Sequence, residues 1–106
     1  MRKKTPSFAD RCYQMLKKVP RGKVTTYRHL AHALGSRAYR AVGQAMKRNP
    51  NAPRVPCHRV VRSDGTLGGY AGGVAKKKRL LTREGVRLRG DRLTELKRQL
   101  HTFGMR

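Results

Sequence analysis

The sequence predicts a mostly α-helical, winged helix-turn-helix-like DNA-binding domain with a small β-hairpin. Three observations favour this fold class. Apolar residues recur at helical spacing in several segments, a tight glycine turn separates two short helices, and 27 Lys and Arg against 5 Asp and Glu give a net charge of +22. A chain of 106 residues can bury one core. We expect a single domain over residues 1–106, with a basic C-terminal extension from about residue 87.

The excess of positive charge calls for an acidic partner, and nucleic acid and an anionic membrane surface are the two candidates. No apolar run approaches the ~18 residues of a membrane span, and the segment TPSFADRCYQ is too polar for a signal peptide. We therefore expect nucleic acid as partner, no membrane association, and a cytoplasmic location, or a nuclear one in a eukaryote. Two unlike cysteines, Cys12 and Cys57, indicate a reducing compartment.

The first two helices follow from their caps and spacing. Thr5-Pro6 is typical of a helix start, a hydroxyl cap followed by proline in the first turn. Cys12 lies on the apolar face of that helix, so we expect it in the core. Thr26 can cap a second helix from Tyr27 to Leu34, which ends at Gly35.

A third helix is predicted from Arg37 to Arg48, with Ser36 as its cap. Together with the preceding helix and the glycine turn, it forms the predicted helix-turn-helix, in which it would meet the duplex. Its small residues allow another backbone to come close. That backbone is either a DNA strand or a second helix of the protein, and both interpretations remain open. The small residues are Ala38, Ala41, Gly43 and Ala45.

The stretch VPCHRVV, residues 55–61, places a cysteine between a proline and a histidine. Proline restricts its own backbone and that of the residue before it, so we expect Cys57 on a stiff extended segment. A neighbouring imidazole or cation promotes the reactive thiolate, and His58 and Arg59 are of the right types. Neighbours in an extended segment point to opposite sides, so the activating contact would be indirect or would come from elsewhere in the chain. The alternative is a buried, inert cysteine.

The segments after the cysteine predict a hairpin and a loop. Val60-Val61 and Thr66-Leu67 flank an Asp-Gly turn, which is typical of two antiparallel strands. Residues 68–73 are glycine-rich but lack the context and the lysine of a phosphate loop. These glycines either let the backbone fold around a flat ligand or simply make turns.

Two further helices are predicted in the C-terminal third. The first runs from Val74 to Glu84, with Leu80 and Leu81 directed inward and Lys76 to Arg79 in solvent. The second covers residues 92–100.

Five blocks in this order resemble a known family: VPRGKVTTY, RAVGQAMKRNP, VPCHRVV, GGYAGG and the later LL..EG. They are similar to the C-terminal, active domain of the O6-alkylguanine-DNA alkyltransferases, from about Phe8 to Val86. The resemblance implies a methylated-DNA–[protein]-cysteine S-methyltransferase that acts once per molecule. It implies no cofactor and no metal. The implied partner is double-stranded DNA containing O6-alkylguanine, bound by a monomer.

The resemblance assigns chemistry to five residues. Cys57 would accept the alkyl group directly from guanine O6. His58 would take the thiol proton through a water, and Glu84 would orient that histidine. Tyr27 would help to rotate the nucleotide and protonate the departing guanine, while Asn49 would brace the turn before the active-site loop.

The resemblance also implies how DNA is held. The target base must leave the duplex stack, and Arg40 would enter the duplex and fill the vacated place. The small residues Ala38, Ala41 and Gly43 suit a helix that meets the minor groove. Tyr70 would form the wall of the alkyl pocket. The base site would be lined by Val55, Pro56, Ala71 and the backbone of Val60.

Two other functions compete with alkyl transfer. Chains of about this length are typical of the alkyltransferase-like branch, which binds the lesion without removing it and recruits excision-repair proteins. That branch usually lacks the acceptor cysteine, so the presence of Cys57 favours transfer. A general basic chromatin-type protein would need none of the five blocks.

Overall fold

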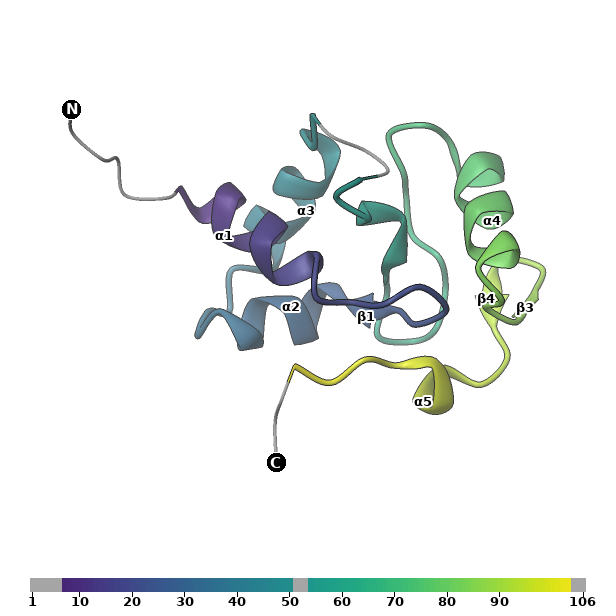
Figure 1. The fold of residues 1–106 in the computed structure, drawn as a ribbon. Helices are drawn as coiled ribbons and strands as arrows, with labels where there is room; N and C mark the ends of the chain where they lie inside the picture. Colours follow the sequence, from purple (N-terminus) through teal and green to yellow (C-terminus); the bar gives the residue numbers. More distant parts are fainter. Residues whose placement is uncertain (1–6, 51–53, 104–106) are drawn as a thin grey trace.

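The computed structural model describes residues 7–50 and 54–103, and it is a mostly helical domain with small sheets. Three helices form one side of the molecule: α1 (Phe8–Leu16), α2 (Tyr27–Ala33) and α3 (Tyr39–Lys47) (Figure 1). The predicted winged helix-turn-helix-like class is confirmed by this arrangement and by its structural relatives.

The caps of the first two helices explain where they begin. Ser7 accepts a hydrogen bond from the backbone of Asp10, whose side chain accepts one in return, a capping box that starts α1 at Phe8. The predicted start at Thr5-Pro6 lies outside the described residues. The Thr26 cap is confirmed, because its hydroxyl accepts a hydrogen bond from the His29 backbone.

The third helix begins later than predicted. It starts at Tyr39 rather than at Arg37, and its N-cap Ala38 makes no side-chain cap bond. The predicted cap was wrong, because the Ser36 hydroxyl instead accepts a hydrogen bond from the Ala38 backbone, 2.9 Å away. Ser36 thereby stabilises the turn between the two helices of the helix-turn-helix rather than the helix itself.

The predicted hairpin around Asp64-Gly65 is wrong in its pairing. Strand β2 (Val60–Val61) pairs in parallel with β1 (Thr25–Thr26), and Thr66 forms an isolated bridge with Arg92. The turn itself forms, since the Arg62 backbone donates to the Thr66 carbonyl at 2.9 Å. The partner of a two-residue strand is set by long-range packing, which a local turn signal does not report.

The last long helix, α4 (Val74–Arg83), lies on the right of Figure 1. The segment after it contains an antiparallel hairpin of β3 (Leu88–Arg89) and β4 (Arg92–Leu93), then a short helix α5 (Leu96–Gln99). The predicted helix over residues 92–100 is therefore wrong in its first half. There, Leu93 pairs with Leu88 in the hairpin, and a residue in this strand pairing cannot belong to a helix that starts at residue 92. The side chain of Leu93 fills a core position.

Two hydrophobic clusters meet at β2. Val60 belongs to the cluster under α1, α2 and α3, and Val61 belongs to the cluster under α4 and the C-terminal hairpin. Successive strand residues point to opposite faces, so one short strand joins both cores. Cys57, three residues before the start of β2, belongs to the first cluster. In the described ranges, no helix is both long and apolar enough to cross a membrane.

Candidate active site

Cys57 lies in a tight turn rather than on the predicted extended segment. It begins a short 3₁₀ helix, η1 (Cys57–Arg59), and its backbone donates to the Val55 carbonyl at 2.8 Å. The same carbonyl accepts a hydrogen bond from the Asn49 side chain at 2.7 Å. Because Asn49 follows the end of α3, this bond ties the third helix to the cysteine turn. The thiol-bearing residue is 5 % exposed.

His58 and Arg59 converge on one carboxylate at the end of α4. His58 Nε2 lies 3.0 Å from Glu84 Oε2. Arg59 binds the same carboxylate through both oxygens, with Nε to Oε1 at 2.9 Å and Nη2 to Oε2 at 2.7 Å. Its remaining nitrogen donates to the Val19 carbonyl at 2.8 Å. The turn therefore places two adjacent side chains on one partner, which an extended segment would keep apart.

Burial and hydrogen bonding set the charge states of this group. Burial lowers the pKa of His58, although the hydrogen bond from its ring to Glu84 opposes that change. Burial alone would raise the pKa of Glu84, but hydrogen bonds from Arg59 and His58 bring that pKa below its ordinary value. The result is a carboxylate beside a neutral imidazole at pH 7.

The second ring nitrogen of His58 identifies the imidazole as a candidate base. Nε2 faces a carboxylate, which holds the proton on that nitrogen, so Nδ1 carries the free lone pair. Within the described residues, His58 Nδ1 is buried and has no hydrogen-bond partner. The ring of Tyr70 packs edge-on against the imidazole, with ring centroids 6.4 Å apart. The imidazole is thus oriented, neutral and able to accept a proton.

Lys77 corrects the prediction that the charged face of α4 is solvated. Its side chain is fully buried, and its ammonium donates to the carbonyls of Val60, Leu67 and Gly69. Burial lowers its pKa to about 8, so it stays largely charged at pH 7. The three bonds tie the strand after the cysteine to the glycine-rich loop. The helical spacing could have predicted this burial, because Lys77 lies one turn before the core residue Leu81 and so on the same face of α4.

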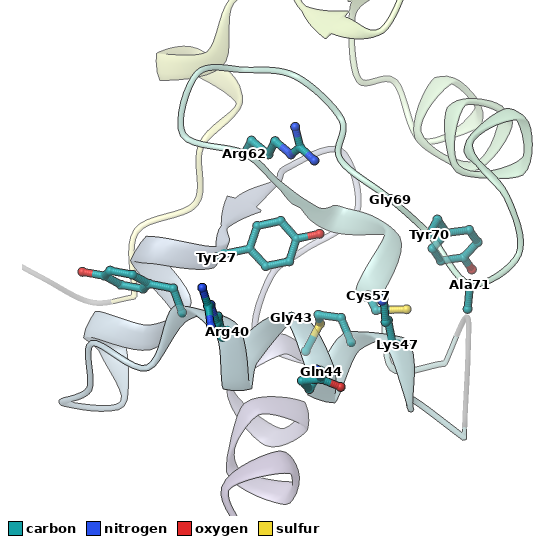
Figure 2. Close-up of a pocket in the computed structure, with 12 residues that line it drawn as sticks. Tyr27, Arg40, Gly43, Gln44, Lys47, Cys57, Arg62, Gly69, Tyr70 and Ala71 are labelled. Carbon is teal, nitrogen blue, oxygen red and sulfur yellow. The ribbon is translucent and has the colours of Figure 1, made fainter.

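A cavity of about 940 Å³ opens in front of the cysteine. Figure 2 shows Tyr27 and Arg40 on one side of it, and Cys57, Tyr70 and Ala71 on the other. Six predicted site residues line it: Tyr27, Arg40, Gly43, Cys57, Tyr70 and Ala71. Six more lining residues were not predicted: Tyr39, Gln44, Met46, Lys47, Arg62 and Gly69.

The other predicted pocket and DNA-binding residues lie elsewhere. Val55, Pro56 and Val60 are buried and are not among the residues that line this cavity. Ala38 is exposed at the start of α3, and Ala41 is half-buried on that helix.

Tyr27 begins α2 and is half-buried at the edge of the cavity. Burial raises the pKa of its hydroxyl, while the positive charge of Arg62 acts to lower it. The phenol therefore keeps its proton at neutral pH and can donate it to a bound group. In the described part of the chain, no cluster of three or more His, Cys, Asp or Glu could hold a metal ion.

The sequence matches one family model, described as the 6-O-methylguanine DNA methyltransferase DNA-binding domain, over residues 7–86. It is 49 % identical over 84 residues to the methylated-DNA–protein-cysteine methyltransferase of Methanothermobacter thermautotrophicus, a match that covers 79 % of this chain and 47 % of that protein. The chain thus spans about half the length of the curated relatives it matches.

Among the solved structures that are similar to this chain are two in complex with DNA. The first is Mycobacterium tuberculosis OGT in complex with DNA, with a TM-score of 0.73 and 40 % identity, covering 77 % of this chain and 51 % of that one. The second is Schizosaccharomyces pombe Atl1 in complex with damaged DNA containing O6-carboxymethylguanine. It has a TM-score of 0.80 and 30 % identity, covering 94 % of this chain and 99 % of that one.

Proposed function

Because this chain belongs to the 6-O-methylguanine DNA methyltransferase family, we propose that it repairs DNA by direct reversal of O6-alkylguanine. The alkyl group passes from guanine O6 to Cys57 in one irreversible turnover. The observation that carries this proposal is a cysteine at the surface of a cavity, beside a neutral histidine that is oriented by a carboxylate. Nucleophile, base and orienting group are the parts that such a transfer needs.

The proposed step exchanges one bond for another. The Cys57 sulfur attacks the alkyl carbon, so that a carbon–sulfur bond forms while the bond from that carbon to guanine O6 breaks. The thiol proton passes through a water to His58 Nδ1, which has no partner among the described residues. Glu84 stabilises the resulting imidazolium. The departing guanine takes a proton from the Tyr27 hydroxyl, leaving an unmodified base.

The proposed substrate is a guanine turned out of double-stranded DNA into the cavity. Arg40, which is exposed on α3 and lines the cavity, would fill the vacated place in the duplex. Gly43 on the same helix lets a strand come close. We propose that the protein acts as a monomer in the cytoplasm, or in the nucleus of a eukaryote, and that it needs no cofactor.

The proposal is tested by the mass of the intact protein after incubation with a duplex that contains one O6-methylguanine. We expect the gain of one methyl group, mapped to the peptide that holds Cys57. Cys57→Ser should abolish the gain and keep DNA binding. Cys12→Ser is the matched control, because Cys12 is fully buried in α1 and should leave the gain unchanged. A Cys57→Ser protein that still takes up methyl would contradict the assignment.

A second candidate function is lesion binding without transfer, followed by recruitment of excision-repair proteins. It is favoured by one observation: the match to Atl1 covers 94 % of this chain, including residues after the family model ends. The same experiment separates the two candidates. Tight, lesion-selective binding without any gain in mass would favour the sensor and would make Cys57 part of the pocket wall.

A further inference from the structure

Tyr39 is an aromatic residue in the cavity wall that the proposed reaction does not use. It is the first residue of α3 and directly precedes Arg40. Its side chain lines the cavity with Tyr27 and Arg40. Among the described residues, Tyr39 and Val74 are the large hydrophobic side chains that stay exposed, Tyr39 at 37 %. An exposed ring beside a binding cavity is available to a ligand.

The ring of Tyr39 is held in place by the other helix of the helix-turn-helix. Its hydroxyl lies 2.8 Å from His32 Nε2 on α2. The two rings meet edge to face, with centroids 5.7 Å apart and an interplanar angle of 62°. A tyrosine has few side-chain torsions to fix, and this contact fixes them before any ligand arrives. The flat face of the ring is thus a preorganised surface.

The residues around Tyr39 indicate which class of ligand it binds. Arg37, Arg40 and Lys47 are exposed on or beside the same helix, and α3 has no acidic residue in its first turn. Exposed aromatic rings among cations are the arrangement by which proteins bind unstacked nucleobases, since the cations bind phosphates and the ring stacks on a base.

We propose that Tyr39 is a base-stacking residue. This inference rests on the proposed function, in which a guanine leaves the duplex. When that base turns out, the faces of the bases beside it lose their stacking partner. The Tyr39 ring, next to Arg40, covers one of those faces and stabilises the opened duplex. Tyr39 therefore increases the affinity for DNA with a turned-out base by a larger factor than it increases the affinity for undamaged DNA.

The experiment measures dissociation constants in a Cys57→Ser background, so that the lesion stays unreacted. Duplexes with and without one O6-methylguanine are compared for the parent, Tyr39→Ala and Tyr39→Phe. We expect Tyr39→Ala to weaken binding of the lesion duplex by roughly tenfold or more, the usual loss for one stacked base, with a smaller change for the undamaged duplex. Tyr39→Phe keeps the ring and should stay close to the parent.

Two further readouts and two further variants distinguish a stacking role of Tyr39 from an effect of charge and from a purely structural role. The slope of the logarithm of affinity against the logarithm of salt concentration should be unchanged in Tyr39→Ala. Lys47→Ala, which removes an exposed cation of the same helix, should lower that slope by about one phosphate contact. The fluorescence of 2-aminopurine placed next to the lesion should be stronger in the complex with Tyr39→Ala than in the complex with the parent, because the tyrosine ring no longer stacks on that base. His32→Ala removes the hydrogen bond but keeps the ring, so it should lose less affinity than Tyr39→Ala.

The outcomes decide the proposal and the proposed function separately. Unchanged lesion binding by Tyr39→Ala overturns the stacking role while leaving transfer intact. Equal losses in Tyr39→Ala, Tyr39→Phe and His32→Ala also overturn it, because they show a structural link between α2 and α3. If the Cys57→Ser parent binds both duplexes equally and the protein with Cys57 intact gains no methyl, the proposed function is overturned, and the stacking role falls with it.

Discussion

The two cysteines show how the environment of a residue decides what it can do. Cys12 lies in the middle of α1 with no exposed surface, and burial raises the pKa of its thiol. Cys57 reaches the wall of an open cavity, with His58 as its neighbour in a tight turn. A thiolate is the reactive form, so Cys12 is suited to packing and Cys57 to chemistry.

At the residue scale, Glu84→Gln tests how the base is oriented. The amide keeps the shape of the carboxylate but cannot balance an imidazolium, so we expect transfer to slow by roughly one to two orders of magnitude. The measurement is the single-turnover rate of methyl loss from duplex DNA. Glu95→Gln is the matched control, because Glu95 pairs only with the neighbouring, exposed Arg98 among the described residues. Equal rates in wild type and Glu84→Gln would rule out the orienting role.

The pH dependence of transfer tests the charge state of His58. Burial lowers the pKa of His58 below the ordinary value of 6.5, so the neutral base form persists as the pH falls past that value. We expect the transfer rate to stay constant as the pH falls through 6.5. The rate should decrease only at lower pH, where His58 becomes protonated. Glu84 acts to raise the pKa of His58, so Glu84→Gln should move this fall to still lower pH. A fall centred above pH 6.5 would contradict the assignment.

At the scale of elements, α4 positions the cavity wall through Lys77. Lys77→Met removes a buried ammonium and leaves the carbonyls of Val60, Leu67 and Gly69 without their donor. We expect a loss of about 2 to 4 kcal/mol in unfolding free energy, measured by urea denaturation. Lys76→Met is the matched control, since Lys76 is exposed one residue earlier on the same helix. Similar stability in both variants would show that the three bonds contribute little.

The C-terminal hairpin is an element that completes the second hydrophobic cluster. Leu93 on β4 is 4 % exposed and packs with Leu81, Val86 and Val61. Leu93→Ala should therefore cost about 2 to 4 kcal/mol of unfolding free energy. Leu88→Ala, on the paired strand but only partly buried, should cost clearly less in the same thermal or chemical unfolding measurement. If the two variants lose equal stability, burial does not explain the role of the hairpin.

The return of the chain to the region of β1 explains why residues 88–103 are folded. The Val24 backbone donates to the Gln99 carbonyl at 2.8 Å and accepts from His101 at 2.7 Å. This closes the sheet region next to β1, which begins one residue later (Figure 1). The C-terminal segment is thus held at its hairpin and again at Gln99 and His101.

At the scale of the whole molecule, we expect charge to dominate the proposed association with DNA. A net charge of +22 implies that binding releases many counterions. We expect the logarithm of the affinity for undamaged duplex to fall linearly and steeply with the logarithm of salt concentration. The measurement is a titration by fluorescence anisotropy at several salt concentrations. A flat dependence would show that the surface cations do not face DNA.

Local signals in the sequence were enough to predict helices α2 and α4 and the types of residue in the candidate site. Thr26 and Gly35 bound the second helix much as predicted, and the PCHRV block identified Cys57 and His58. Glu84 was assigned only through resemblance, since no local pattern relates the residue after α4 to a histidine 26 positions earlier. Arg59 was weighed as a neighbour of the cysteine, whereas its bidentate bond to Glu84 depends on how α4 packs.

The sequence by itself determined the helical class and the family's sequence blocks, and it predicted a polyanionic partner, because caps, periodicity and charge are properties of short segments. Only the tertiary structure decided that β2 pairs with β1, that Lys77 is buried, and that Tyr39 faces the cavity. Each of these depends on contacts between segments far apart in the chain. Their free energy comes from burying surface that the local sequence does not specify.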